Sequence, residues 1–96
     1  MNAAIDLGLE HPAVIIEAKI LGTAWKWKVR EAVAQLYEYR YFQVIDPAAS
    51  LLILADKPLP VDWVRYLESD RKIGLVWPAG RGWHLSARAR KVFPVG

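Results

Sequence analysis

The stretch that decides the fold is residues 14–20, Val-Ile-Ile-Glu-Ala-Lys-Ile, which begins with β-branched apolar residues and carries an acid and a lysine near its end. β-Branched residues pack well on a pleated surface, so this composition predicts a strand. Side chains alternate between the two faces of a strand, and Glu17 and Lys19 are two residues apart. We therefore expect the carboxylate and the ammonium group to lie side by side on one face.

A second strand is expected immediately before this one, because apolar residues alternate with acids or glycine over 5–10. His11-Pro12 then interrupts the alternation, which predicts the turn of a hairpin. In a turn that is symmetric about these two residues, Asp6 lies opposite Glu17, with Cβ atoms ~4.5–5.5 Å apart. Two facing carboxylates repel each other, and a divalent cation such as Mg²⁺ relieves the repulsion because it binds hard oxygen ligands.

Spacing alone also allows a second interpretation of these three residues, and favours it over a metal site. Asp6, Glu17 and Lys19 are then solvated residues on the polar face of an amphipathic hairpin. A loop of odd length also moves Asp6 away from Glu17.

Alternating helix and strand patterns follow downstream. Apolar residues recur at spacings of three and four over about 26–42, and neither glycine nor proline occurs in 29–46, which predicts a helix. The elements expected after it are a buried, parallel strand at 51–55, a helix at about 61–69, a strand at 73–77 and a returning strand at 83–86. The order β-β-α-β-α-β predicts an α/β fold, with a small mixed β-sheet flanked by helices.

Composition excludes several classes of protein. The chain has 96 residues, so we expect one domain over 1–96. It has no cysteine, which excludes disulfide frameworks and thiol nucleophiles, and its 54% hydrophobic content excludes a disordered chain. No apolar run approaches the ~18–20 residues that span a bilayer, so we expect a cytoplasmic protein with no membrane partner. The net charge of +3 permits a polyanionic partner without requiring one.

Two motifs carry a resemblance to a known family. Asp6, followed after a spacer by Ile16-Glu17-Ala18-Lys19, resembles the D…(D/E)xK signature of the PD-(D/E)XK nuclease superfamily. Gln35 and Tyr39 are similar to the QxxxY motif of its RecB-like branch. The resemblance covers roughly residues 4–45. It implies a restriction-endonuclease-like core that lacks the family's usual first helix and strand, since only five residues precede Asp6.

The resemblance also implies an activity. The chain would be an endodeoxyribonuclease that hydrolyses DNA phosphodiester bonds with Mg²⁺, or with Mn²⁺ in its place, in phage defence, restriction or repair. The implied metal ligands are Asp6, Glu17 and the carbonyl of Ala18. The implied catalytic residues are Asp6, Glu17, Lys19, Gln35 and Tyr39. Gln35 and Tyr39 are one helical turn apart, so they share a face from which they would position nucleic acid or brace the metal site.

Aromatic and basic residues interleave ahead of the Gln35 helix, in Trp25-Lys26-Trp27-Lys28 and Arg30. The rings would stack on unpaired bases while Lys26, Lys28 and Arg30 contact phosphates. Two alternatives remain: one tryptophan fills the core and the lysines are solvated, or an extended segment presents both tryptophans to a dimer interface. Arg81, in a basic C-terminal hairpin, is a further candidate DNA contact.

The expected partners follow from these features. They are DNA rather than RNA, together with a second copy of the chain or a partner chain that supplies the missing first helix. The competing hypothesis is a non-catalytic nucleic-acid-binding or dimerisation module with a degenerate nuclease fold. Metal-dependent cleavage of DNA distinguishes the two.

Overall fold

The structure is a computed structural model that describes residues 2–5, 13–44 and 46–93. Its first half contains β1 (Asn2–Ile5), β2 (Val14–Lys19) and α1 (Trp25–Tyr39), which continues as a π-helical segment (Arg40–Val44). Its second half contains β3 (Ser50–Ala55), α2 (Val61–Tyr66) with a π-helical continuation (Leu67–Arg71), β4 (Ile73–Ala79), β5 (Gly82–Leu85) and α3 (Ala87–Val92). The predicted order of strands and helices is confirmed. The last helix, α3, is an addition to it.

The strands form one mixed sheet. Within the described residues it has five strands in the order β1-β2-β3-β4-β5. The three central strands are parallel, as expected for 51–55, and the two edge strands are antiparallel to their neighbours. The helical crossovers α1 and α2 make this parallel pairing possible, because parallel neighbours cannot be joined by a tight turn. The α/β class with a mixed sheet and flanking helices is therefore confirmed.

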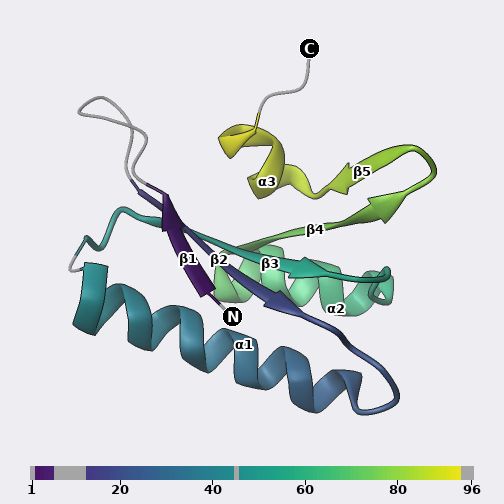
Figure 1. Cartoon of the computed structure of the whole chain (residues 1–96), viewed down its shortest axis with the longest axis horizontal. Coiled ribbons are helices and arrows are strands. Elements are labelled where there is room, and N and C mark those ends of the chain that lie inside the picture. The colour runs from purple at the N-terminus through teal and green to yellow at the C-terminus, as the bar shows by residue number, and fades with distance from the viewer. Residues whose placement is uncertain (1, 6–12, 45, 94–96) are drawn as a thin grey trace.

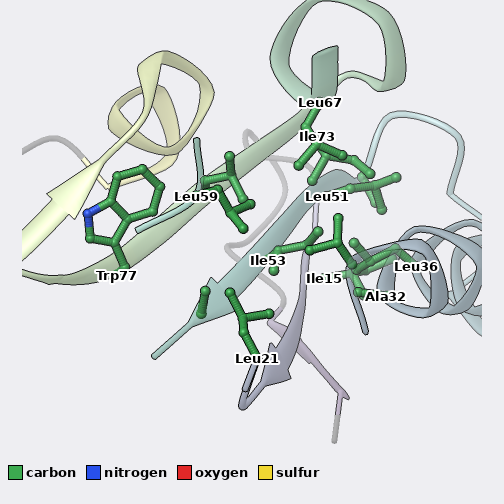
Figure 2. Close-up of a cluster of buried hydrophobic side chains, with 14 residues drawn as sticks. Ile15, Leu21, Ala32, Leu36, Leu51, Ile53, Leu59, Leu67, Ile73 and Trp77 are labelled. Carbon is green, nitrogen blue, oxygen red and sulfur yellow. The ribbon is translucent and has the colours of Figure 1, made fainter. Parts of the chain in front are cut away.

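Helices cover the two faces of the sheet unequally (Figure 1). The main core lies on the face that α1 and α2 cover, where Ile15, Ile53 and Leu75 project from three neighbouring strands. Figure 2 shows this cluster, with Ala32 and Leu36 of α1 packed against the strands. The opposite face carries a smaller cluster in which Ala89 of α3 packs on the sheet. The face toward α1 is therefore the better buried one.

Gly74 of β4 lies directly under α3. A Cβ atom at this position would come within 2.5 Å of Leu52 Cδ2 and 2.8 Å of the backbone nitrogen of Ala89. A side chain can rotate away from such a contact, but the backbone of α3 has to move as a whole. Glycine is therefore required here by close packing.

We predict that Gly74→Ala lowers the free energy of unfolding by about 1–3 kcal/mol, because overpacking forces the helix off the sheet. Urea denaturation measures the loss. Gly82→Ala is the matched control, since nothing lies within 4 Å of its Cβ position. Equal stability of Gly74→Ala and the parent would contradict the packing of α3 on β4.

The hairpin register is the main correction to the sequence analysis. Asn2, and not Asp6, is the cross-strand partner of Glu17, and Ile5 pairs with Val14. The prediction was wrong because it assumed a turn symmetric about His11-Pro12, whereas the strands pair four positions further toward the N-terminus. Asp6, His11 and Pro12 themselves lie outside the described residues. Because the pairing is shifted by an even number of residues, the two faces of the hairpin are not exchanged, and Glu17 still shares a face with Ile15 and Lys19.

Over 2–5, 13–44 and 46–93, no helix is long and apolar enough to cross a bilayer.

Candidate active site

Glu17 is an acid in the main core. It lies in β2 two residues after Ile15, on the face that α1 covers, and its exposed fraction is 1%. The predicted grouping of Ile15, Glu17 and Lys19 on one face is confirmed, but this face is not the solvated one. A carboxylate moved from water into an apolar interior loses hydration worth several kcal/mol, and must recover it from neighbouring polar groups.

Lys19 supplies one such neighbour. Its Nζ lies 3.9 Å from Glu17 Oε1 and donates a hydrogen bond to Glu31 Oε1 of α1. The side chain of Lys19 is 11% exposed, so the ammonium group is held between one buried and one accessible carboxylate. The prediction that acid and ammonium are neighbours is confirmed. The ammonium group of Lys19 is therefore held in one position before any ligand binds.

Glu31 is the site residue that sequence reasoning missed. It lies four residues before Gln35, so Glu31, Gln35 and Tyr39 form one row along α1. This spacing was the available signal, because a row that contains the QxxxY residues and faces β2 must also bring Glu31 toward it. The pKa of Glu31 is lowered, first by the hydrogen bond from Lys19 and then by the positive charges of Lys19 and Lys28.

We predict that the Glu31 carboxyl in the folded protein titrates below its ordinary value of 4.5. Because the folded pKa is depressed, the stabilisation from the Lys19 pair is fully present above the unfolded pKa. It is lost as the pH falls through the folded pKa. Carbon-detected NMR titration measures the midpoint, which should return toward 4.5 in Lys19→Met and stay low in Lys57→Met. Identical midpoints in the parent and Lys19→Met would contradict the pair.

Gln35 and Tyr39 follow Glu31 on the same row. The Oε1 atom of Gln35 is buried, and no described residue donates a hydrogen bond to it. Buried amide oxygens normally accept at least one hydrogen bond, so this acceptor is available to a further group. Tyr39 is half-buried and packs against the main core. The helix therefore presents an acid, an amide and a phenol in order along the β2 side.

The loop after β2 is tied to the end of β3. Asp56 Oδ1 accepts a hydrogen bond of 3.0 Å from the backbone N–H of Leu21, and Lys57 Nζ lies 3.4 Å from the carbonyl of Gly22. These contacts join the carboxyl ends of two parallel strands, which is the edge of open α/β sheets where ligands bind. Lys19 lies at this edge.

The predicted metal ligands are only partly within the described chain. Glu17 is described, Asp6 is not, and Ala18 pairs with Leu54 in the centre of the sheet. In the part of the chain that the structure describes, no group of three or more His, Cys, Asp or Glu side chains is found that could hold a metal ion. The catalytic and metal-binding roles of all the predicted site residues stay predictions.

The tryptophan-lysine segment is helical, since α1 begins at Trp25. Residues two apart on a helix point in different directions, so the alternative in which an extended segment presents both rings on one side does not apply. Trp25 is half-buried and meets the ring of Trp63 of α2 edge-on, with centroids 5.3 Å apart. Trp27 is 68% exposed.

The basic residues of this segment divide between two flanks of α1. Lys28 lies on the flank of Glu31. Arg30 lies toward α2, with its Cζ 5.9 Å from the centroid of Trp63, and Lys26 Nζ lies 5.6 Å from the centroid of Trp25. A groove of about 400 Å³ runs between the helices, lined by Val29, Arg30, Val33, Asp62, Trp63 and Tyr66. Arg81 is apart from all of these, in the turn between β4 and β5.

Comparison of the chain with protein-family models, with curated proteins and with solved structures finds no match. What the fold and the site define is a small α/β protein with a buried acid-lysine cluster beside its longest helix.

Proposed function

We propose that this chain is a metal-dependent nuclease that hydrolyses DNA phosphodiester bonds, built on a restriction-endonuclease-like core. The observation that carries the proposal is the burial of Glu17 beside Lys19 in an otherwise apolar core. A buried carboxylate loses hydration worth several kcal/mol, so an acid is a costly side chain for a core position. Buried acids paired with a specific cation at the edge of a sheet are characteristic of functional sites.

The chain's own residues have distinct roles in this proposal. Lys19 supplies a fixed positive charge, which stabilises negative charge that grows on a phosphate during hydrolysis. Glu31 holds the ammonium group in place through its hydrogen bond. Gln35, whose buried oxygen has no donor among the described residues, orients a group that enters between α1 and β2.

The proposed cation is Mg²⁺, with Mn²⁺ in its place. Carboxylate oxygens are the hard ligands that Mg²⁺ prefers, and Glu17 offers one that water does not reach. In the proposal Glu17 holds the cation with the Ala18 carbonyl; Asp6, predicted as a further ligand, follows Ile5, whose cross-strand partner is Val14 and not Glu17. A bound divalent cation supplies Lewis-acid polarisation of a phosphate oxygen.

The proposal predicts that the protein cuts plasmid or single-stranded DNA when Mg²⁺ is present and stops when EDTA is added. Lys19→Met should slow cleavage by about 10²–10³-fold, because it removes a fixed charge from the developing transition state. Lys57→Met is the matched control. It removes an exposed ammonium group at the same edge of the sheet and should cut like the parent. Cleavage by Lys19→Met at the parent rate would overturn the assignment.

A non-catalytic nucleic-acid-binding module is the second candidate. The observation in its favour is the groove between α1 and α2, where Trp63 and Tyr66 offer aromatic faces next to Arg30. Such faces stack on unpaired bases whatever the sequence. Fluorescence anisotropy with labelled DNA tests it, since equal binding by the parent and Lys19→Met with no cleavage by either would favour this module over the nuclease.

A further inference from the structure

A basic pocket lies at the opposite end of the parallel strands from Lys19. Its cationic side chains are those of Arg40, in the π-helical continuation of α1, Lys72, between the second π-helical segment and β4, and Arg88 and Lys91 of α3. Residues at the start of β3 form the floor, and the cavity has a volume of about 230 Å³. This is smaller than the ~300–1,000 Å³ of typical organic-ligand pockets, so it suits a small anion.

The positive charges of this pocket are only partly neutralised by neighbouring acids. Arg88 is paired with Glu68, whose Oε1 lies 3.5 Å from Arg88 Nε and whose Oε2 accepts the Arg88 backbone N–H. Arg40 donates to the carbonyl of Ala49 and Lys72 donates to the carbonyl of Ser69, both of which are neutral acceptors. Within the described residues, Arg40, Lys72 and Lys91 form no ion pair, so the pocket keeps a positive charge.

Asp46 is an acid next to the basic pocket. It lines the neighbouring pocket that shares Arg40, and its Oδ1 accepts the backbone N–H of Ala48. Of the described residues that line the basic pocket, four are cations and none is an acid. Arg40 also lies over the ring of Tyr37, with Cζ 5.0 Å from the centroid, so its planar guanidinium group is held in a fixed orientation. A guanidinium group fixed in this way matches the oxygens of a phosphate.

Lys72 adds an independent observation. Its φ is 59°, and it is the one non-glycine residue with positive φ in the described ranges. The position follows the end of a helix, where the left-handed conformation is usual but glycine or asparagine normally adopts it. A lysine there is disfavoured by the backbone, while its side chain adds a cation to the pocket.

We propose that this basic pocket binds a phosphate group, either of a nucleic acid or of free inorganic phosphate. It does not share a phosphate with the Lys19 site. Lys19 pairs with Ala55 at one end of β2, and Val14 pairs with Ser50 at the other end. Five residues, or about 16 Å of strand, therefore separate the Lys19 site from the basic pocket. The inference therefore stands whether or not the chain is a nuclease.

NMR titration of the ¹⁵N-labelled parent tests the proposal with two probes, inorganic phosphate and a short single-stranded DNA without a terminal phosphate. Saturable shifts of the Ser50, Lys72 and Arg88 amides are expected with at least one probe. Saturation with phosphate identifies a free-anion site, and saturation with DNA alone identifies a backbone-phosphate site. No saturable shift at these amides with either probe would overturn the proposal.

Two variants separate binding from folding. Lys72→Gly should weaken binding by about threefold to tenfold, since one charged and partly screened contact is lost, yet unfold at no lower urea concentration than the parent. Lys91→Gln should weaken binding by a similar factor. Arg90→Gln, the matched control on α3, removes the same charge from a side chain that bonds the Leu85 carbonyl instead. If Arg90→Gln weakened binding equally, the loss would follow from net charge alone, and the proposed phosphate site would be overturned.

Discussion

Replacing Glu17 with leucine is expected to slow DNA cleavage by at least about 100-fold, while the protein stays folded. Glu17 is buried among apolar side chains, so leucine fills the same space without desolvating a charge. Lys19 is not left uncompensated, because Glu31 still accepts its hydrogen bond.

The stability change and the cleavage rate are measured on the same samples. Urea denaturation should give a cooperative unfolding transition for Glu17→Leu, which shows that the loss of cleavage is not a loss of folding. Ile15→Leu is the matched control, since Ile15 lies on the same strand and face. It should cut like the parent and lose less than about 1.5 kcal/mol. A Glu17→Leu variant that cuts at the parent rate would remove Glu17 from the reaction.

Truncating Ile53 to alanine is expected to lower the free energy of unfolding by about 2–5 kcal/mol. Ile53 is fully buried in the central strand, between the strands that carry Glu17 and Leu75. The lost methyl and methylene groups leave a cavity that α1 and the sheet cannot close without moving. This is a large fraction of the stability of a domain of this size.

Leu54→Ala is the control for this prediction. Leu54 is the next residue of β3 but lies on the opposite face, half-buried beside an apolar groove. Its truncation should cost less than half as much, because part of its surface already meets water. Similar losses for Ile53→Ala and Leu54→Ala in urea denaturation would contradict a core concentrated under α1 and α2.

The order of elements could be predicted because each carries its own local signal. Apolar residues at helical spacing marked α1, and the short apolar runs marked β3 and β4. The segment Ala87–Val92 was missed because Arg88, Arg90 and Lys91 dominate its composition. It is held as a helix by tertiary packing of the small residue Ala89 against the sheet, which the local pattern does not reveal.

The candidate site was predictable only in part. Alternation along β2 placed Glu17 and Lys19 on one face, but it could not say that α1 would cover that face and bury the acid. The hairpin register depended on a turn whose length no periodicity fixes, so the pairing of Glu17 with Asp6 was wrong. Glu31 was missed because its partner Lys19 belongs to another element, and such contacts come from packing.

The most direct test of the proposed metal site is to find which residues of the parent protein lie close to bound Mn²⁺. Paramagnetic Mn²⁺ broadens the NMR signals of nuclei close to it, and Mn²⁺ can occupy the oxygen-ligand site proposed for Mg²⁺. The account predicts that substoichiometric Mn²⁺ first broadens the amide signals of Glu17, Ala18 and Lys19 and the side-chain amide of Gln35, and that Glu17→Leu removes this effect. Broadening that begins elsewhere, or that persists in Glu17→Leu, would contradict a metal-dependent site at this acid.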